Sequence, residues 1–323
     1  MIESPTGVAA VVIYCCALFG TTGNLIVLFA FISNALKHKV LQPLDRIIVN
    51  MAIVNLLLCC YKEIPGLLLL FHTRVFEELG CQILLYTYHT LRMVSIWSVE
   101  NLSLLHLIKI QRPNHRWSKF IHRHQGLYVN WTLAGCWVFS IFLHIPYLQY
   151  NTTAVNKDNT TIVYLTSANC LGKSASVIIK FITYTSVTMD FISIIIVTVL
   201  NVFTVNVICK HRRQVRSIHA AHAAVSSWNK HSVQATKILL SLLTIYVVCW
   251  ISSDIIWIAI ISGFIQGEME NIWLNTTYGI FSSVYYSASA CVMIFGYRKV
   301  KDYLGQARCC AKGRKPTPVL TIH

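Results

Sequence analysis

The residues best suited to chemistry in this 323-residue chain are polar side chains set inside long apolar runs. One run carries Tyr88, His89 and Arg92, and another carries Asp254 one helical turn after Trp250. Residues three or four apart share a helix face, so Tyr88, His89 and Arg92 lie together. An ionisable group inside a membrane helix is costly unless it has a partner or a task. Such groups, with aromatic rings beside them, would line a cup for a small amphiphilic ligand.

Arg92 is the strongest candidate for ligand recognition. A guanidinium presents paired N–H donors, so we expect Arg92 to bind an anionic group such as a carboxylate or sulfate. The alternative is that Arg92 only neutralises a buried carboxylate, of Asp254 or Glu63, and ties two helices together. Lys180 is a further ligand candidate, and the same structural alternative applies to Lys180 and Asp190.

The sequence predicts neither catalysis nor a cofactor. No nucleophile and base have a spacing that requires an enzyme. The 12 cysteines are scattered, and neither a CxxC nor an HxxxH spacing indicates a metal site.

These residues must be positioned by membrane helices. The chain is 55% hydrophobic and 12% charged, with a mean hydropathy of +0.57, whereas soluble domains carry about 25% charged residues. Apolar runs long enough to cross a bilayer occur at about 6–31, 46–71, 81–108, 126–148, 175–208, 235–264 and 272–296. We therefore expect an all-α bundle of seven transmembrane helices in a multi-pass protein of the plasma membrane.

The basic residues orient this bundle. Most of the 27 lysines and arginines follow the first, third, fifth and seventh runs. Because cytoplasmic loops are enriched in these residues, the N-terminus is expected outside the cell. The net charge of +15 then reflects topology and the lipid bilayer, and we expect no nucleic-acid partner.

The outer loops carry two kinds of modification signal. Asn151 and Asn159 begin Asn-Thr-Thr tripeptides in the loop before the fifth run, which makes both candidates for glycosylation. Cys81 opens the third run and Cys170 closes the same loop. Both would face an oxidising lumen, which permits a disulfide over the mouth of the bundle. Two free thiols are the alternative.

The chain divides into a seven-helix transmembrane domain, residues 1–296, and a cytoplasmic segment, residues 297–323. The stretch YRKVKDYLGQARCC alternates apolar and basic residues, as expected of a short amphipathic helix on the inner leaflet. Cys309 and Cys310 at its end are candidates for S-palmitoylation. An unmodified, solvated tail is the alternative.

Several residues in the runs resemble the motifs of class A G-protein-coupled receptors. They are Gly23-Asn24, Asn50-Met51-Ala52 with Asn55, and Tyr246, Cys249 and Trp250. The chain also departs from that pattern. Asn55 replaces the usual sodium-binding aspartate, Ser252 replaces a proline, and Leu105-His106-Leu107 replaces Asp-Arg-Tyr. The last run lacks Asn-Pro-x-x-Tyr. The resemblance therefore implies a divergent receptor.

The chain more closely resembles vomeronasal type-1 receptors and their fish relatives, the olfactory receptors related to class A. The resembling stretches are YKEIPG, GCQILLYTYHTLRM, KIQRPNHRWSKF, CKHRRQVRSIH and SVQATKILLSLLTIYVVCW. Ala290 stands where the vomeronasal type has a proline. These families bind small odorants or pheromones and couple through Gi/Go-type heterotrimeric G proteins. The resemblance thus implies a chemosensory receptor for a small, possibly acidic, organic ligand.

The same resemblance assigns His106 and Lys109, with the basic ends of the fifth and sixth runs, to the surface that contacts the G-protein α subunit. Bitter taste receptors are the nearest alternative, because Lys109-Ile110 resembles the end of their third span. The pairing of Cys81 with Cys170 argues against them. A small-solute transporter and a scaffold that senses no ligand are more distant alternatives. The runs show neither an inverted repeat nor the broken helices of a transporter.

Overall fold

The computed structural model of the chain describes residues 5–70, 78–110, 116–149, 177–218, 225–262 and 268–311. Within these ranges the chain is helical except for short turns, and no strand occurs. The elements are α1 (Pro5–His38), α2 (Pro43–Leu70), α3 (Glu78–Ile110), α4 (Arg116–Arg123), α5 (Gln125–His144), the 3-10 helix η1 (Ile145–Gln149), α7 (Val177–Ile218), α8 (Val225–Ser262), α9 (Glu268–Gly296) and α10 (Arg298–Ala311).

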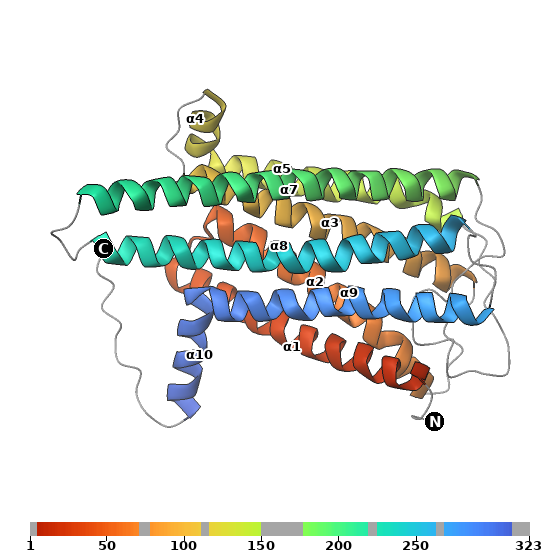
Figure 1. Cartoon of the computed structure of the whole chain (residues 1–323). Coiled ribbons are helices and arrows are strands. Elements are labelled where there is room, and N and C mark those ends of the chain that lie inside the picture. The colour runs from red at the N-terminus through yellow and green to blue at the C-terminus, as the bar shows by residue number, and fades with distance from the viewer. Residues whose placement is uncertain are drawn as a thin grey trace.

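Seven helices of the described chain are long and apolar enough to cross a membrane, and they form one bundle (Figure 1). They are α1, α2, α3, α5 with η1, α7, α8 and α9. The predicted seven-helix architecture is confirmed. The helices α7 and α8 run beyond the predicted spans, toward the loop that joins them. The polar residues there include neither glycine nor proline, so the helices continue after the apolar run has ended.

The two short helices α4 and α10 lie at the same end of the bundle, opposite the start of α1 (Figure 1). The sequence did not predict α4, a single eight-residue helix with basic residues in its last turn. The helix α10 was predicted and begins two residues after α9 ends. Both belong to chain segments that the basic residues place in the cytoplasm.

Two glycines let α1 approach its neighbours closely. A Cβ atom on Gly23 would lie 2.8 Å from the Cβ of Ala290 on α9, and one on Gly20 would lie 2.6 Å from the Sγ of Cys59 on α2. At contacts this short, a side chain at either glycine would force its neighbour to shift. Ala290, which stands where a proline was expected, is fully buried in a continuous helix. At this position α9 packs against α1.

The cytoplasmic helix α10 is fastened to α1 and α2. Nζ of Lys299 lies 2.5 Å from Oδ2 of Asp45 and 5.8 Å from the centre of the Phe31 ring. Nζ of Lys37 also donates a hydrogen bond of 2.7 Å to Oε1 of Gln306. These contacts fix the inner end of the bundle to the first turns of the tail.

Several predicted modification sites cannot be placed. Three of the residues lie outside the described ranges: Asn151, Asn159 and Cys170. Three others lie on described helices, but their side chains are outside the described part of the structure: Cys81, Cys309 and Cys310. The disulfide, the glycans and the palmitoyl groups therefore stay predictions.

Candidate functional site

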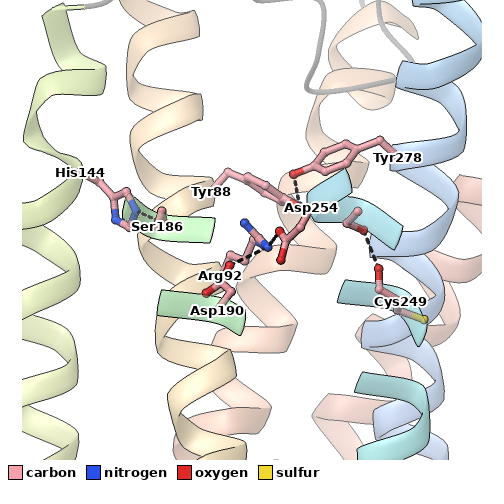
Figure 2. A network of polar contacts seen from close by, with 9 residues as sticks. Tyr88, Arg92, His144, Ser186, Asp190, Cys249, Asp254 and Tyr278 are labelled. Carbon is pink, nitrogen blue, oxygen red and sulfur yellow. Dashed lines mark hydrogen bonds and ion pairs between the residues drawn. The ribbon is translucent and has the colours of Figure 1, made fainter. Parts of the chain in front are cut away.

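The guanidinium of Arg92, on α3, meets two carboxylates inside the bundle (Figure 2). Its Nη2 lies 2.7 Å from Oδ2 of Asp190 on α7 and also donates a hydrogen bond to Oδ1 of Asp254 on α8. All three residues are at most 2% exposed. Buried charges persist in proteins when they are paired. This charged triad of Arg92, Asp190 and Asp254 therefore ties α3 to both α7 and α8.

The pairing within the triad is uneven. One nitrogen, Nη2, serves both carboxylates. Within the described residues, Nε of Arg92 and Oδ2 of Asp254 are buried without a hydrogen-bond partner, and neither oxygen of Asp190 accepts a hydrogen bond beyond its ion-pair contact. The guanidinium carbon of Arg92 stands 4.7 Å from the centre of the Trp250 ring. Arg92 thus has carboxylates at one nitrogen and an aromatic face beside it.

His89 lies one turn before Arg92 and packs among aromatic rings. Its ring stacks on Tyr147 of η1, with centroids 4.6 Å apart and planes at 8°, and lies 5.2 Å from the Trp257 ring of α8. Nε2 of His89 is buried and has no hydrogen-bond partner among the described residues. His89 therefore offers a polar ring atom inside an otherwise apolar contact.

His144 at the end of α5 is held by its own hydrogen bonds. Nδ1 lies 2.8 Å from the carbonyl oxygen of Ser140, and Nε2 lies 3.3 Å from Oγ of Ser186 on α7 (Figure 2). Both ring nitrogens of His144 therefore have a polar partner inside the bundle. His144 joins α5 to α7 beside the triad.

Aromatic side chains surround the outer side of the triad. The Tyr278 hydroxyl on α9 donates a hydrogen bond of 2.8 Å to the Tyr88 hydroxyl, and both rings lie near Arg92 (Figure 2). The Tyr88 ring is 5.5 Å from Tyr61 of α2, and Trp257 stacks on Tyr278 at 5.8 Å. Rings from α3, α8 and α9 thus lie beside the charged centre, and Tyr61 of α2 packs behind Tyr88.

The structure gathers most of the residues singled out from the sequence. Tyr88, Trp250 and Asp254 lie around Arg92, and His89 lies one turn away. Lys180 does not join them: it is partly exposed near the start of α7, about 15 Å of helix rise from Asp190.

The pairing of Asp190 with Arg92 was not predicted. The sequence offered Asp254 and Glu63 as partners of Arg92 and Asp190 only as a charge neutralised inside the bundle, whereas the structure places Asp190 against the guanidinium. The sequence feature that could have pointed to Asp190 is a single aspartate within the apolar stretch VTMDFIS. The Glu63 side chain lies outside the described part of the structure. Among the described residues, no three His, Cys, Asp or Glu side chains form a group that could hold a metal.

A line of buried contacts runs from the triad toward the inner half of the bundle. The Trp250 ring lies 5.0 Å from Tyr285, whose hydroxyl is 3.4 Å from Oγ of Ser95. Ser95 donates to Oδ1 of Asn55 at 2.9 Å, and Nδ2 of Asn55 donates to Oγ of Ser289 at 3.0 Å. An amide bridging two serines thus occupies the place where an aspartate was expected.

The inner end of α3 carries His106 and Lys109. His106 is partly buried, whereas Lys109 is exposed in the last turn of the helix. One turn before His106, Oγ of Ser103 accepts a hydrogen bond of 3.3 Å from Nδ2 of Asn201 on α7. Both residues thus lie in the last turns of α3, on a helix that is held to α7.

Seven membrane-length helices around a buried charged centre define a multi-pass membrane protein of the seven-helix receptor type. The model of the vomeronasal organ pheromone receptor family matches residues 8–304. The chain belongs to this family, and it is a receptor of the plasma membrane.

Individual relatives agree with this membership. Human vomeronasal type-1 receptor 3 is 25% identical over 232 residues, which cover 70% of this chain and 73% of that protein. The zebrafish olfactory receptor class A-like protein 1 is 22% identical over 286 residues, 87% of each chain. The mouse taste receptor type 2 member 102 is also similar, at 24% identity over 323 residues, 96% of this chain and 91% of that protein. The family match places the chain with the vomeronasal receptors.

Proposed function

We propose that the chain is a chemosensory receptor that binds a small organic ligand in the outer half of the bundle and signals through a heterotrimeric G protein of the Gi/Go type. The charged triad carries this proposal, because it joins three helices at a site enclosed by aromatic rings. Ligand sites combine apolar area with a few placed polar groups. The names of the relatives, vomeronasal and olfactory receptors, support the same activity.

The proposed ligand-binding residues have distinct roles. Tyr88, His89 and Trp250 supply ring surface, and Arg92 with Asp254 supplies charge. Lys180 lies closer to the outer end of the bundle, about 15 Å of helix rise from Asp190. An acidic ligand would have to take Arg92 from its aspartates, whereas a basic ligand would bind the aspartates directly.

Signalling requires that the ligand favour one of two helix arrangements. The triad spans α3, α7 and α8, so a ligand that changes its pairing changes how these helices are held. The contacts of Trp250, Tyr285 and Ser95 lead from this site toward the inner half. There we propose that His106 and Lys109 contact the G-protein α subunit. Because Leu105-His106-Leu107 replaces Asp-Arg-Tyr, the arginine that usually locks the inactive state of class A receptors is absent, and some basal activity is expected.

The function is tested with the receptor expressed at the cell surface and a Gi/Go-responsive reporter. Acidic aromatics, amines and neutral alcohols serve as candidate ligands. A saturable response to any of these ligands that disappears in cells lacking the Gi/Go α subunits supports the proposal. Absence of a response to all of them, at verified surface expression, counts against it.

The location of the site is tested with two variants that keep the bundle charged. Arg92→Lys retains a cation for both aspartates but loses the planar donor fork, and His89→Ala removes a ring from the aromatic enclosure. Each is expected to weaken the response at least tenfold. Thr188→Val is the control, because Thr188 is exposed on α7 and its hydroxyl bonds its own helix at Tyr184. Unchanged responses in both variants would place the ligand elsewhere.

A further inference from the structure

We infer that the charged triad of Arg92, Asp190 and Asp254 selects ligands that carry a cationic amine over ligands that carry a carboxylate. This inference rests on the proposed function, since it names the ligand chemistry of the same site. It reverses the acidic ligand that the isolated arginine suggested in the sequence.

The first argument is the charge of the site. One guanidinium faces two carboxylates, so the ionised triad has one negative charge in excess. No further ion pair to the triad occurs among the described side chains, and Lys180 lies about 15 Å of helix rise away. Lys62 and Glu63, whose side chains are outside the described part, carry opposite charges. An added anion would double the excess, whereas an added cation would cancel it.

The second argument is the balance of donors and acceptors. Three carboxylate oxygens of the triad are buried and accept no hydrogen bond from the described residues: Oδ2 of Asp254 and both oxygens of Asp190, of which Oδ2 keeps its ion-pair contact with Arg92. On the donor side, Nε of Arg92 is buried without a partner among the described residues. The triad therefore has more unpaired acceptors than unpaired donors. An ammonium brings N–H donors and no acceptor, and a carboxylate brings acceptors and no donor. The amine matches what the site lacks.

The third argument is the aromatic enclosure. Arg92 already lies against the Trp250 ring, which shows that a cation is accommodated on an aromatic face here. On the outer side of the triad, the Tyr278 ring packs edge to face on Tyr88 at 6.1 Å and stacks on Trp257 at 5.8 Å. Such clusters of rings attract ammonium groups through their negative faces. The enclosure therefore favours the same ligand charge as the carboxylates.

Amine binding would also act on the helices. The triad is closed in this structure, with Asp254 fully buried, so a ligand must open the packing above it to enter. Once bound, the ammonium would contact Asp190 on α7 and Asp254 on α8 and relieve Arg92 on α3 of part of its pairing. A ligand that binds this opened arrangement more tightly shifts the population toward it.

The test compares ligands that share one skeleton and differ in charge. The purified full-length receptor in lipid nanodiscs is heated with 2-phenylethylamine, 2-phenylethanol or phenylacetate, and with the corresponding indole series. Affinity is obtained from the saturable rise in Tm. We expect each amine to bind at least tenfold more tightly than its alcohol, and each carboxylate more weakly than the alcohol. Equal affinity across a series, tighter binding of the carboxylates, or no stabilisation by any amine overturns the inference.

Two isosteric variants identify the groups responsible. Asp254→Asn and Asp190→Asn each remove the excess charge while preserving side-chain shape, and each should reduce the amine-to-alcohol preference at least tenfold. Glu100→Gln is the matched control, because it removes a carboxylate from α3 about two turns further inward and should leave the preference unchanged. If neither variant folds, the comparison of ligands on the wild-type receptor still decides the question.

The thermal measurement needs no G protein, so it separates the two proposals. Selective stabilisation by amines without a reporter response would support the ligand class and contradict the signalling proposal. A reporter response and stabilisation by carboxylates alone would support signalling and contradict the ligand class.

Discussion

Nη2 of Arg92 lies 2.7 Å from Oδ2 of Asp190, which places an ion pair between α3 and α7. The same nitrogen bonds Asp254, so the position of α8 depends on the same atom. Apolar helix faces have little preference for one another over lipid, whereas polar contacts between helices are directional. The triad therefore helps to specify which helices are neighbours.

Arg92→Ala is expected to destabilise the receptor by about 3–5 kcal/mol, because it leaves two buried carboxylates without a cation. The measurement is thermal unfolding of the purified receptor, together with antibody staining at the cell surface. The triple variant Arg92→Ala, Asp190→Asn, Asp254→Asn should recover much of the loss, since these three positions then carry no charge. Lys180→Ala, at a partly exposed position, is the control. A single variant as stable as the wild type would show that the pairs do not hold the bundle.

Ser289→Ala is expected to cost about 1–3 kcal/mol, because it leaves the buried Nδ2 of Asn55 without its acceptor. Ser95→Ala should have a similar effect through Oδ1 of Asn55. Thermal unfolding measures both. Thr22→Val provides the comparison, since the Thr22 hydroxyl is bonded to its own helix on an exposed side. Equal Tm values for Ser289→Ala and Thr22→Val would contradict a structural role for the amide bridge.

Gly23→Ala is expected to destabilise the packing of α1 on α9 by about 1–3 kcal/mol, as overpacking does. The new Cβ would lie 2.8 Å from that of Ala290. Ala290→Gly in the same chain should restore part of this stability, because it removes the clashing Cβ. The recovery is incomplete, since a glycine inside a helix itself costs about 1 kcal/mol. Gly135→Ala on α5 is the control, because nothing lies within 4 Å of the added carbon. Independent, additive effects of the two substitutions would rule out the proposed contact.

The pH dependence of stability should include a contribution from Tyr297, just beyond the last span. Burial and the Asp45 carboxylate raise the pKa of the Tyr297 phenol above its ordinary value. The folded state then holds this proton more tightly than the unfolded state. The contribution is complete below the unfolded pKa of about 10 and is lost as the pH rises above it.

Tyr297→Phe removes this contribution. The variant should therefore show a shallower loss of Tm than the wild type above about pH 10. Thermal unfolding over the alkaline range measures the difference, with Tyr184→Phe, at an exposed position on α7, as the control. Identical slopes for Tyr297→Phe and the wild type would contradict the assignment.

Hydropathy predicted the helices, because each apolar run consists of residues that are near one another in sequence. The orientation that the basic loops indicate stays a prediction. The central member of the site, Arg92, was also predictable, because a charge at mid-membrane depth stands out in one helix. Its partner Asp190 was not, because periodicity gives the face of each helix but not its neighbours. The bridge of Asn55 to Ser95 and Ser289 was missed for the same reason. The sequence around a small polar residue on a buried helix face does not indicate which other helix that residue will contact.

The separation of the triad along the chain has a consequence for biosynthesis. Arg92 precedes Asp254 by 162 residues, and Asp190 also emerges well after it. When α3 enters the membrane its arginine has no aspartate from α7 or α8 to meet, and inserting an unpaired arginine at the helix centre costs about 3 kcal/mol. The nascent helix therefore depends on later segments for its stability in the bilayer. A chain truncated before α7 would contain neither aspartate and would present an unpaired charge that the quality-control machinery of the endoplasmic reticulum can recognise. Export of the chain would therefore indicate that Arg92 has paired with an aspartate of the later helices.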